Sequence, residues 1–229
     1  MLKKIAGLCF MLLLFSKVQS QHTNLICESC GDFDILKITF NENIEAITAK
    51  AASSRTVFVN ETCEEKDADE LTKKDQVCGF QYNIYKKEVK KPFLSVSGKF
   101  NFDILHLLSN AEKSLVAYAA TSYFTGEEKD FQLLVDTISK KFNAKPERKN
   151  LFIDGSLVYQ WNAPEYICQV SRSKDQKQEE LTVNGKTVIK KYYYTTFSVY
   201  KNNKLDPKIK EIIRHNANFV LYKDKDFVK

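Results

Sequence analysis

Glycine and proline are scarce in this chain of 229 residues, which contains only seven glycines and four prolines. So few glycines leave little material for the loops that bind phosphates or dinucleotides, and no such motif occurs. No motif for a hydrolase nucleophile occurs either. We therefore expect no nucleotide cofactor and no other cofactor. We also expect a well-folded chain without low-complexity segments.

Long apolar runs are also lacking, apart from one run of eleven residues at positions 5–15. A membrane-spanning helix needs about 20 such residues. Lys3 and Lys4 precede the run and Val18-Gln19-Ser20 follows it, which is the layout of a secretory signal peptide. We expect residues 1–20 to be removed, leaving 21–229 as a secreted or periplasmic domain without an integral membrane segment. A subdivision of this domain near residue 125 is the alternative.

A strong excess of one charge is missing too. The formal net charge of +6 falls to +3 once the lysines of the signal peptide are removed. No basic stripe alternates with aromatic residues, so we do not expect nucleic acid as a partner. The lysine cluster at residues 86–91 is typical of a solvated hairpin end that discourages aggregation. Contact with an acidic partner or with anionic lipid is the alternative.

Five cysteines remain after cleavage, and thiols in an oxidising compartment tend to pair, so we expect two disulfides and one unpaired cysteine. Cys63 and Cys78 bracket the most charged stretch of the chain and are the easiest pair to bridge. Closing this ring of about 16 residues would contribute roughly 3 kcal/mol. The candidates for disulfides are Cys27, Cys30, Cys63, Cys78 and Cys168.

The spacing of Cys27 and Cys30 leaves three interpretations open. A redox pair needs its first cysteine at a helix N-terminus, and here a glycine and a strand-like segment follow instead. A zinc site needs a second pair at short spacing, and none follows. We expect a structural disulfide, made within the pair or with another cysteine, and no metal site.

The order of apolar residues predicts an α+β fold, an antiparallel sheet of meanders and hairpins with one long and one or two short helices on one face. Residues 127–142 place apolar side chains at helical spacing, with acids at the start and lysines at the end. Residues 207–215 predict a second helix, and a short one follows Asn41. Strands are expected at 33–40, 55–60, from 78 onward, at 114–124 and at 218–223. Asn184-Gly185 predicts a hairpin turn.

The types and spacing of the polar residues in the sequence do not indicate a set of catalytic residues. His106 is expected to be a structural histidine with its hydrogen bonds satisfied, and His215 ends the last helix. Asp67-Ala68-Asp69-Glu70 resembles the start of a calcium loop but lacks its glycine and closing glutamate. The alternative function is a secreted hydrolase, whose paired carboxylates would come from distant strands.

Aromatic residues are abundant and are the remaining indication of function. Rings on the less buried face of the sheet could bind a protein, peptide or sugar with little loss of entropy. Ordinary packing between strands is the alternative. We predict an exported, non-enzymatic binding or accessory protein that contacts a macromolecule. Its candidate face consists of Tyr159, Trp161, Tyr166, Tyr192, Tyr194 and Tyr200.

Overall fold

The computed structural model describes residues 33–48, 52–85, 94–125, 128–151, 153–183 and 186–228. The expected signal peptide, Cys27 and Cys30, the lysine cluster at 86–91 and the turn at 184–185 lie outside the described residues. None of the described helices is long and apolar enough to cross a membrane.

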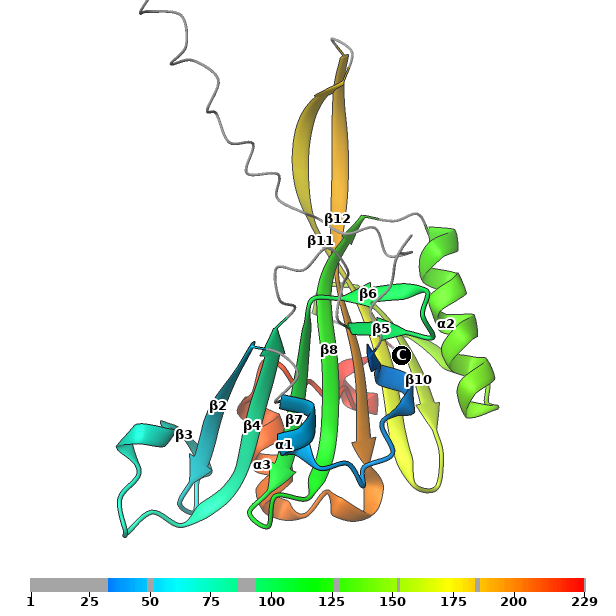
Figure 1. Ribbon diagram of the computed structural model, residues 1–229. Helices are drawn as coiled ribbons and strands as arrows, with labels where there is room; N and C mark the ends of the chain where they lie inside the picture. Colours follow the sequence, from blue (N-terminus) through cyan, green and yellow to red (C-terminus); the bar gives the residue numbers. More distant parts are fainter. Residues whose placement is uncertain are drawn as a thin grey trace, which may run out of the picture.

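The described residues form a nine-stranded antiparallel sheet with the strand order β3-β2-β4-β7-β8-β12-β11-β10-β9 (Figure 1). Its strands are β2 (Ala52–Val59), β3 (Glu64–Asp67), β4 (Val77–Tyr85), β7 (Ile104–Asn110), β8 (Leu115–Thr125), β9 (Glu147–Asn150), β10 (Leu157–Asn162), β11 (Tyr166–Val183) and β12 (Lys186–Lys201). A smaller sheet joins β1 (Phe33–Asp34), β5 (Leu94–Val96) and β6 (Phe100–Phe102). The helices are α1 (Ile44–Thr48), α2 (Glu128–Phe142) and α3 (Pro207–His215). The predicted α+β class is confirmed, and strands from both sides of residue 125 share the large sheet.

The two longer helices belong to two different hydrophobic clusters. The apolar residues of α2 pack with Phe197 and Val199 of β12, whereas those of α3 pack with Tyr200 of the same strand. Because successive residues of a strand point to opposite faces, α2 and α3 cover opposite faces of the sheet. In Figure 1, α2 stands in front of the sheet and α3 behind it. The expectation that the helices gather on one face is therefore wrong, since both sheet faces carry apolar residues that need cover.

Helix α2 (Glu128–Phe142) forms where the pattern predicted it, and Glu127, the first residue of the predicted range, lies outside the described residues. Glu128 and Asp130 lie in the first turn and Lys140 and Lys141 in the last, as the helix dipole favours. Asn143 follows with a positive φ of 47°, the left-handed conformation that ends helices. The buried side chains of the helix are Phe131, Leu134, Val135 and Ile138.

Three local predictions differ from the structure. The strand expected at residues 33–40 is a two-residue strand followed by a 3-10 helix, because the Asp34 carboxylate accepts a hydrogen bond from the Leu36 amide. The cap of α1 is Asn43 rather than Asn41, since Asn43 Oδ1 accepts from the Glu45 and Ala46 amides. The strand expected at 218–223 is absent, and this segment is irregular.

Other strands and the last helix agree with the sequence. Strand β8 (Leu115–Thr125) begins and ends one residue later than the predicted 114–124. Helix α3 has the predicted bounds, with Asp206 Oδ1 accepting from the Ile209 amide as its cap. Strands β11 and β12 pair from Tyr166↔Lys201 to Val183↔Lys186. The far part of this hairpin, here called the arm (residues 174–183 and 186–191), projects beyond the rest of the sheet in Figure 1.

Candidate functional site

The six candidate aromatic residues do not form one surface. Tyr159 and Trp161 are buried beneath α2, where the Tyr159 hydroxyl donates to Gln132 Oε1 at 3.1 Å and the Trp161 indole donates to Ser139 Oγ at 3.1 Å. Tyr166 packs its ring on Phe142, with 4.8 Å between the ring centroids. These three rings are part of the core that α2 covers.

The remaining three candidates lie on strand β12. Tyr200 is fully buried in the cluster that α3 covers. Tyr194 is half-buried and lies on the same face as Tyr200, because the two are an even number of residues apart. The side chain of Tyr192 lies outside the described residues. The predicted common face therefore divides between the two sides of the sheet, and Tyr194 borders a cavity.

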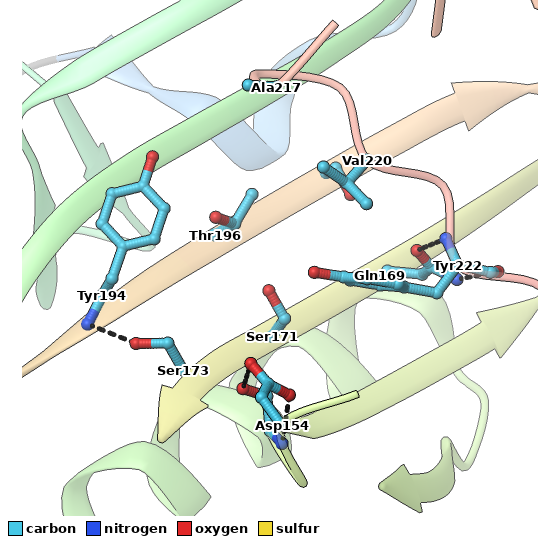
Figure 2. A pocket seen from close by; sticks show the side chains of 11 residues that line it. Asp154, Gln169, Ser171, Ser173, Tyr194, Thr196, Ala217, Val220 and Tyr222 are labelled. Carbon is cyan, nitrogen blue, oxygen red and sulfur yellow. Dashed lines mark hydrogen bonds between the residues drawn. The ribbon is translucent and has the colours of Figure 1, made fainter. Parts of the chain in front are cut away.

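This cavity, here called the hydroxyl pocket, lies on the face of β11 and β12 opposite to α2 and has a volume of about 90 Å³. Figure 2 shows side chains from these two strands, a turn before β10 and the segment after α3 surrounding it. Gln169 and Ser198 are buried, and the other strand residues are half-buried. The lining consists of Asp154, Ser156, Gln169, Ser171, Ser173, Tyr194, Thr196, Ser198, Ala217, Val220 and Tyr222.

Alternation along the two strands places these side chains together. Residues 169, 171 and 173 of β11 face the pocket while Cys168 and Val170 face α2. On β12, residues 194, 196 and 198 face it while Phe197 and Val199 face α2. The register aligns Ser171 with Thr196, so the polar side chains of both strands lie side by side. The sequence shows that polar and apolar residues alternate along each of these strands. It does not show which polar residue of β11 lies beside which polar residue of β12.

The segment after α3, here called the strap (residues 216–222), closes one side of the pocket. Gln169 holds its end, because Nε2 donates to the Tyr222 carbonyl at 2.8 Å and Oε1 accepts from the Tyr222 amide at 3.1 Å. Phe219 is fully buried and meets the ring of His106 edge-on at 6.2 Å. The Gln169 side chain thus replaces the strand partner expected for residues 218–223.

Further hydrogen bonds hold the lining in place. Ser173 Oγ accepts from the Tyr194 amide at 3.2 Å. Asp154 accepts from the Ser156 amide at 2.8 Å and from the Ser156 hydroxyl at 2.6 Å. Burial, and to a lesser extent the nearby Asp154 carboxylate, raises the pKa of Tyr222. The pocket therefore offers neutral hydroxyl and amide groups around one carboxylate.

The cysteines and histidines of the described residues do not contribute to this pocket. Cys63, Cys78 and Cys168 are buried free thiols, so the expected Cys63–Cys78 disulfide is not formed in the structure. His106 is buried, with Nδ1 at 2.7 Å from Asn83 Oδ1 and Nε2 at 3.2 Å from Thr121 Oγ1. Its expected role as a satisfied structural histidine is confirmed.

A metal site is not apparent in the described part of the chain, where no three histidine, cysteine or acidic side chains come together. The acidic run at residues 67–70 lies at the end of β3 and in a 3-10 helix. Comparison of the chain with protein-family models, curated proteins and solved structures found no match. The chemistry of the pocket therefore carries the functional inference.

Proposed function

We propose that this chain is an exported, non-enzymatic binding protein that holds a hydroxyl-bearing part of a macromolecular partner, such as a glycan, in the hydroxyl pocket. The observation that carries this proposal is the row of polar side chains on β11 and β12. Elsewhere the same face is packed by the apolar residues of α3. A polar ligand that bonds to these hydroxyl and amide groups would keep them hydrogen-bonded when it displaces water from the pocket.

The lining favours a neutral ligand with many hydroxyl groups. Serine, threonine and tyrosine hydroxyls both donate and accept, as sugar hydroxyls do. Asp154 is the one charged residue among the described residues that line the pocket. A volume of about 90 Å³ holds a few water molecules or one protruding group, whereas whole ligands usually occupy about 300–1,000 Å³. The pocket thus suits the tip of a larger molecule.

A buried hydroxyl next to the pocket extends this polar surface. Burial raises the pKa of the Tyr200 hydroxyl, and the nearby Ser198 hydroxyl lowers it. Ser198 lines the pocket and lies on the same face of β12 as Tyr200. The polar groups of this face therefore continue from the pocket towards Tyr200.

The absence of a paired carboxylate in the pocket supports binding rather than hydrolysis. Glycoside hydrolases use two carboxylates, and the described lining contains only Asp154. A thiol nucleophile is also disfavoured, because burial and the neighbouring Cys78 thiol raise the pKa of Cys63 to about 12. Burial lowers the pKa of His106 to about 4, which leaves its imidazole neutral.

Binding of glycans to the mature protein tests the proposal. We expect a neutral glycan on an array to bind, and Thr196→Val or Ser171→Ala to weaken binding about three- to tenfold through the loss of one hydrogen bond. The matched control is Thr187→Val, which alters an exposed residue of the same strand outside the pocket. Equal binding by all three variants, hydrolysis of the bound glycan, or no binding to any glycan would contradict the proposal.

We further propose that the mature protein is exported and that Cys63 and Cys78 pair as a disulfide there. Both thiols lie in the same buried cluster. Cys78 Sγ donates to the Asn60 carbonyl at 2.8 Å, and the Cys63 amide donates to the same oxygen at 3.2 Å. The two sulfurs therefore share one neighbourhood at the end of the β2–β3 hairpin. Cys27 and Cys30 stay a predicted structural pair.

Secretion and thiol content test this second proposal. We expect the exported protein to begin at Gln21 and its Cys63 and Cys78 peptides to be linked in non-reducing mass spectrometry. The bridge would add roughly 3 kcal/mol to the free energy of unfolding. Cys168→Ser serves as the control that leaves this link intact. A full-length cytosolic protein with reduced thiols would be the contrary result.

A further inference from the structure

A second cavity of about 470 Å³ lies on the other side of the strap. It is within the size range of small-molecule sites and is formed by β2, β3, β4 and the end of α3. Ala217 of the strap lines both this cavity and the hydroxyl pocket. The lining consists of Thr56, Phe58, Thr62, Cys63, Glu64, Glu65, Gln81, Asn83, Ile212, His215, Asn216, Ala217 and Asn218.

A chain of hydrogen bonds between side chains holds the amide wall of this cavity rigid. Asn216 Nδ2 donates to Gln81 Oε1 at 2.5 Å, and Gln81 Nε2 donates to Asn83 Oδ1 at 2.6 Å. Asn83 Oδ1 is also 2.7 Å from Nδ1 of the buried His106. Side chains locked in this way form a preorganised surface, which reduces the entropy lost when a ligand binds.

The rest of the lining combines negative charge with an apolar floor. Glu64 and Glu65 are exposed at the rim, and Asn60 Nδ2 donates to Glu64 Oε1 at 3.0 Å. Phe58, 4 % exposed, and Ile212, 1 % exposed, provide apolar surface. None of the described residues that line the cavity is lysine or arginine, although the chain contains 35 of them.

The histidine at the rim does not offset this charge. His215 Nε2 lies 3.0 Å from Glu211 Oε1, one turn back along α3. Arg214 also bonds to the Glu211 carboxylate. The cationic groups at the end of α3 are therefore engaged with Glu211. Glu65 lies opposite Phe58 in the β2–β3 pairing and shares its face of the sheet, so its carboxylate faces the cavity, whereas the neighbouring Glu64 is bonded to Asn60.

From these features we infer that the second cavity binds a compact organic cation, a guanidinium or primary ammonium group on a short aliphatic stem. The cationic head pairs with the Glu65 carboxylate at the rim. The stem packs on Phe58 and Ile212, and the aromatic ring of Phe58 adds attraction for the cation. Lysine or arginine side chains and free polyamines share this chemistry.

Titration of the isotopically labelled mature protein with n-butylguanidinium, followed by NMR, tests the site. We expect shifts at cavity residues such as Gln81 and Asn216, and much weaker binding of n-butylurea, the neutral molecule of the same shape. The variant Glu65→Gln should weaken binding about two- to fivefold, as expected for one partly exposed ion pair. Higher salt should weaken it as well.

A matched control separates the site from general surface charge. Glu61→Gln removes an exposed carboxylate from the same turn that does not line the cavity, and it should leave binding unchanged. Equal affinity for butylurea, or an unaltered affinity in the Glu65→Gln variant, would overturn the inference. Comparing spermidine with an acetylated arginine peptide then distinguishes a free polyamine from a peptide ligand. The Thr196→Val variant should bind the cation as the wild type does. The proposals for the two cavities can therefore be tested independently of each other.

Discussion

At the scale of single residues, His106 shows how the structure keeps a titratable group inside an apolar core. Asn83 Oδ1 accepts only, so Nδ1 of the imidazole donates to it and Nε2 accepts from the Thr121 hydroxyl. These are the roles of the two ring nitrogens in the neutral imidazole, the form that burial favours. Burial lowers its pKa from 6.5 to about 4, because charging the ring would cost hydration.

This shift predicts a pH-dependent stability. Because the pKa is lower in the folded than in the unfolded chain, protons favour unfolding. The contribution of His106 is complete above about pH 6.5 and is lost progressively as the pH falls towards 4, in total about 3 kcal/mol. Urea unfolding at several pH values measures this slope.

Two variants identify the histidine responsible. His106→Gln retains a donor and an acceptor but does not titrate, so the slope between pH 6.5 and 4 should become smaller. His215→Gln changes an exposed histidine at the end of α3 and should leave the slope as it is. An equal slope in the wild type and in His106→Gln would rule out this explanation.

At the scale of elements, α2 depends on packing rather than on its exposed charges. One side of the helix is buried against β10 and β11, whereas Leu133 on another side is 42 % exposed. The ion pair between Arg172 and Glu128 joins β11 to the first turn. Since the Glu128 side chain is 63 % exposed, we expect this pair to contribute little.

Two alanine substitutions, one on the buried side of α2 and one on its exposed side, test whether packing stabilises the helix. Ile138→Ala should lower the free energy of unfolding by about 2–5 kcal/mol, because Ile138 is completely buried and the substitution leaves a cavity. Leu133→Ala, in the same helix, should change it by about 0.5 kcal/mol or less. Chemical denaturation of both variants measures the difference, and similar losses would show that α2 packs otherwise.

At the scale of the whole molecule, some strands pair with a neighbour on both sides and others on one side only. Strand β8 pairs with β7 on one side and with β12 on the other, and β12 is paired with both β8 and β11 from Tyr192 to Tyr200. In the arm, the described pairs join β11 and β12 only to each other. A two-stranded hairpin alone is marginally stable in water.

Hydrogen exchange should follow this division. We expect amides of β8 and of residues 195–200 to open with a free energy close to that of global unfolding, and amides of the arm to open with a free energy near zero. Exchange measured by mass spectrometry on overlapping peptides resolves the two regions. Equal protection would indicate that the arm is covered by a partner or by a second copy of the chain.

The sequence by itself determined those elements whose signals are local. Helical spacing, acids at the start and lysines at the end predicted α2. A proline and three isoleucines predicted α3, and alternation predicted β8. The structural role of His106 followed from its place between apolar residues. In each case the residues that decide the outcome lie within a few positions of one another.

Only the tertiary structure decided which residues share a face and which cavities result. Tyr159 and Tyr200 looked alike in sequence, yet the strand register turns one towards α2 and the other away from it. The strap replaced an expected strand because a side chain, Gln169, supplied its hydrogen bonds. When polar and apolar residues alternate, the sequence shows that the strand has two different faces. Which of these faces meets a helix depends on how the strand pairs with strands far along the chain.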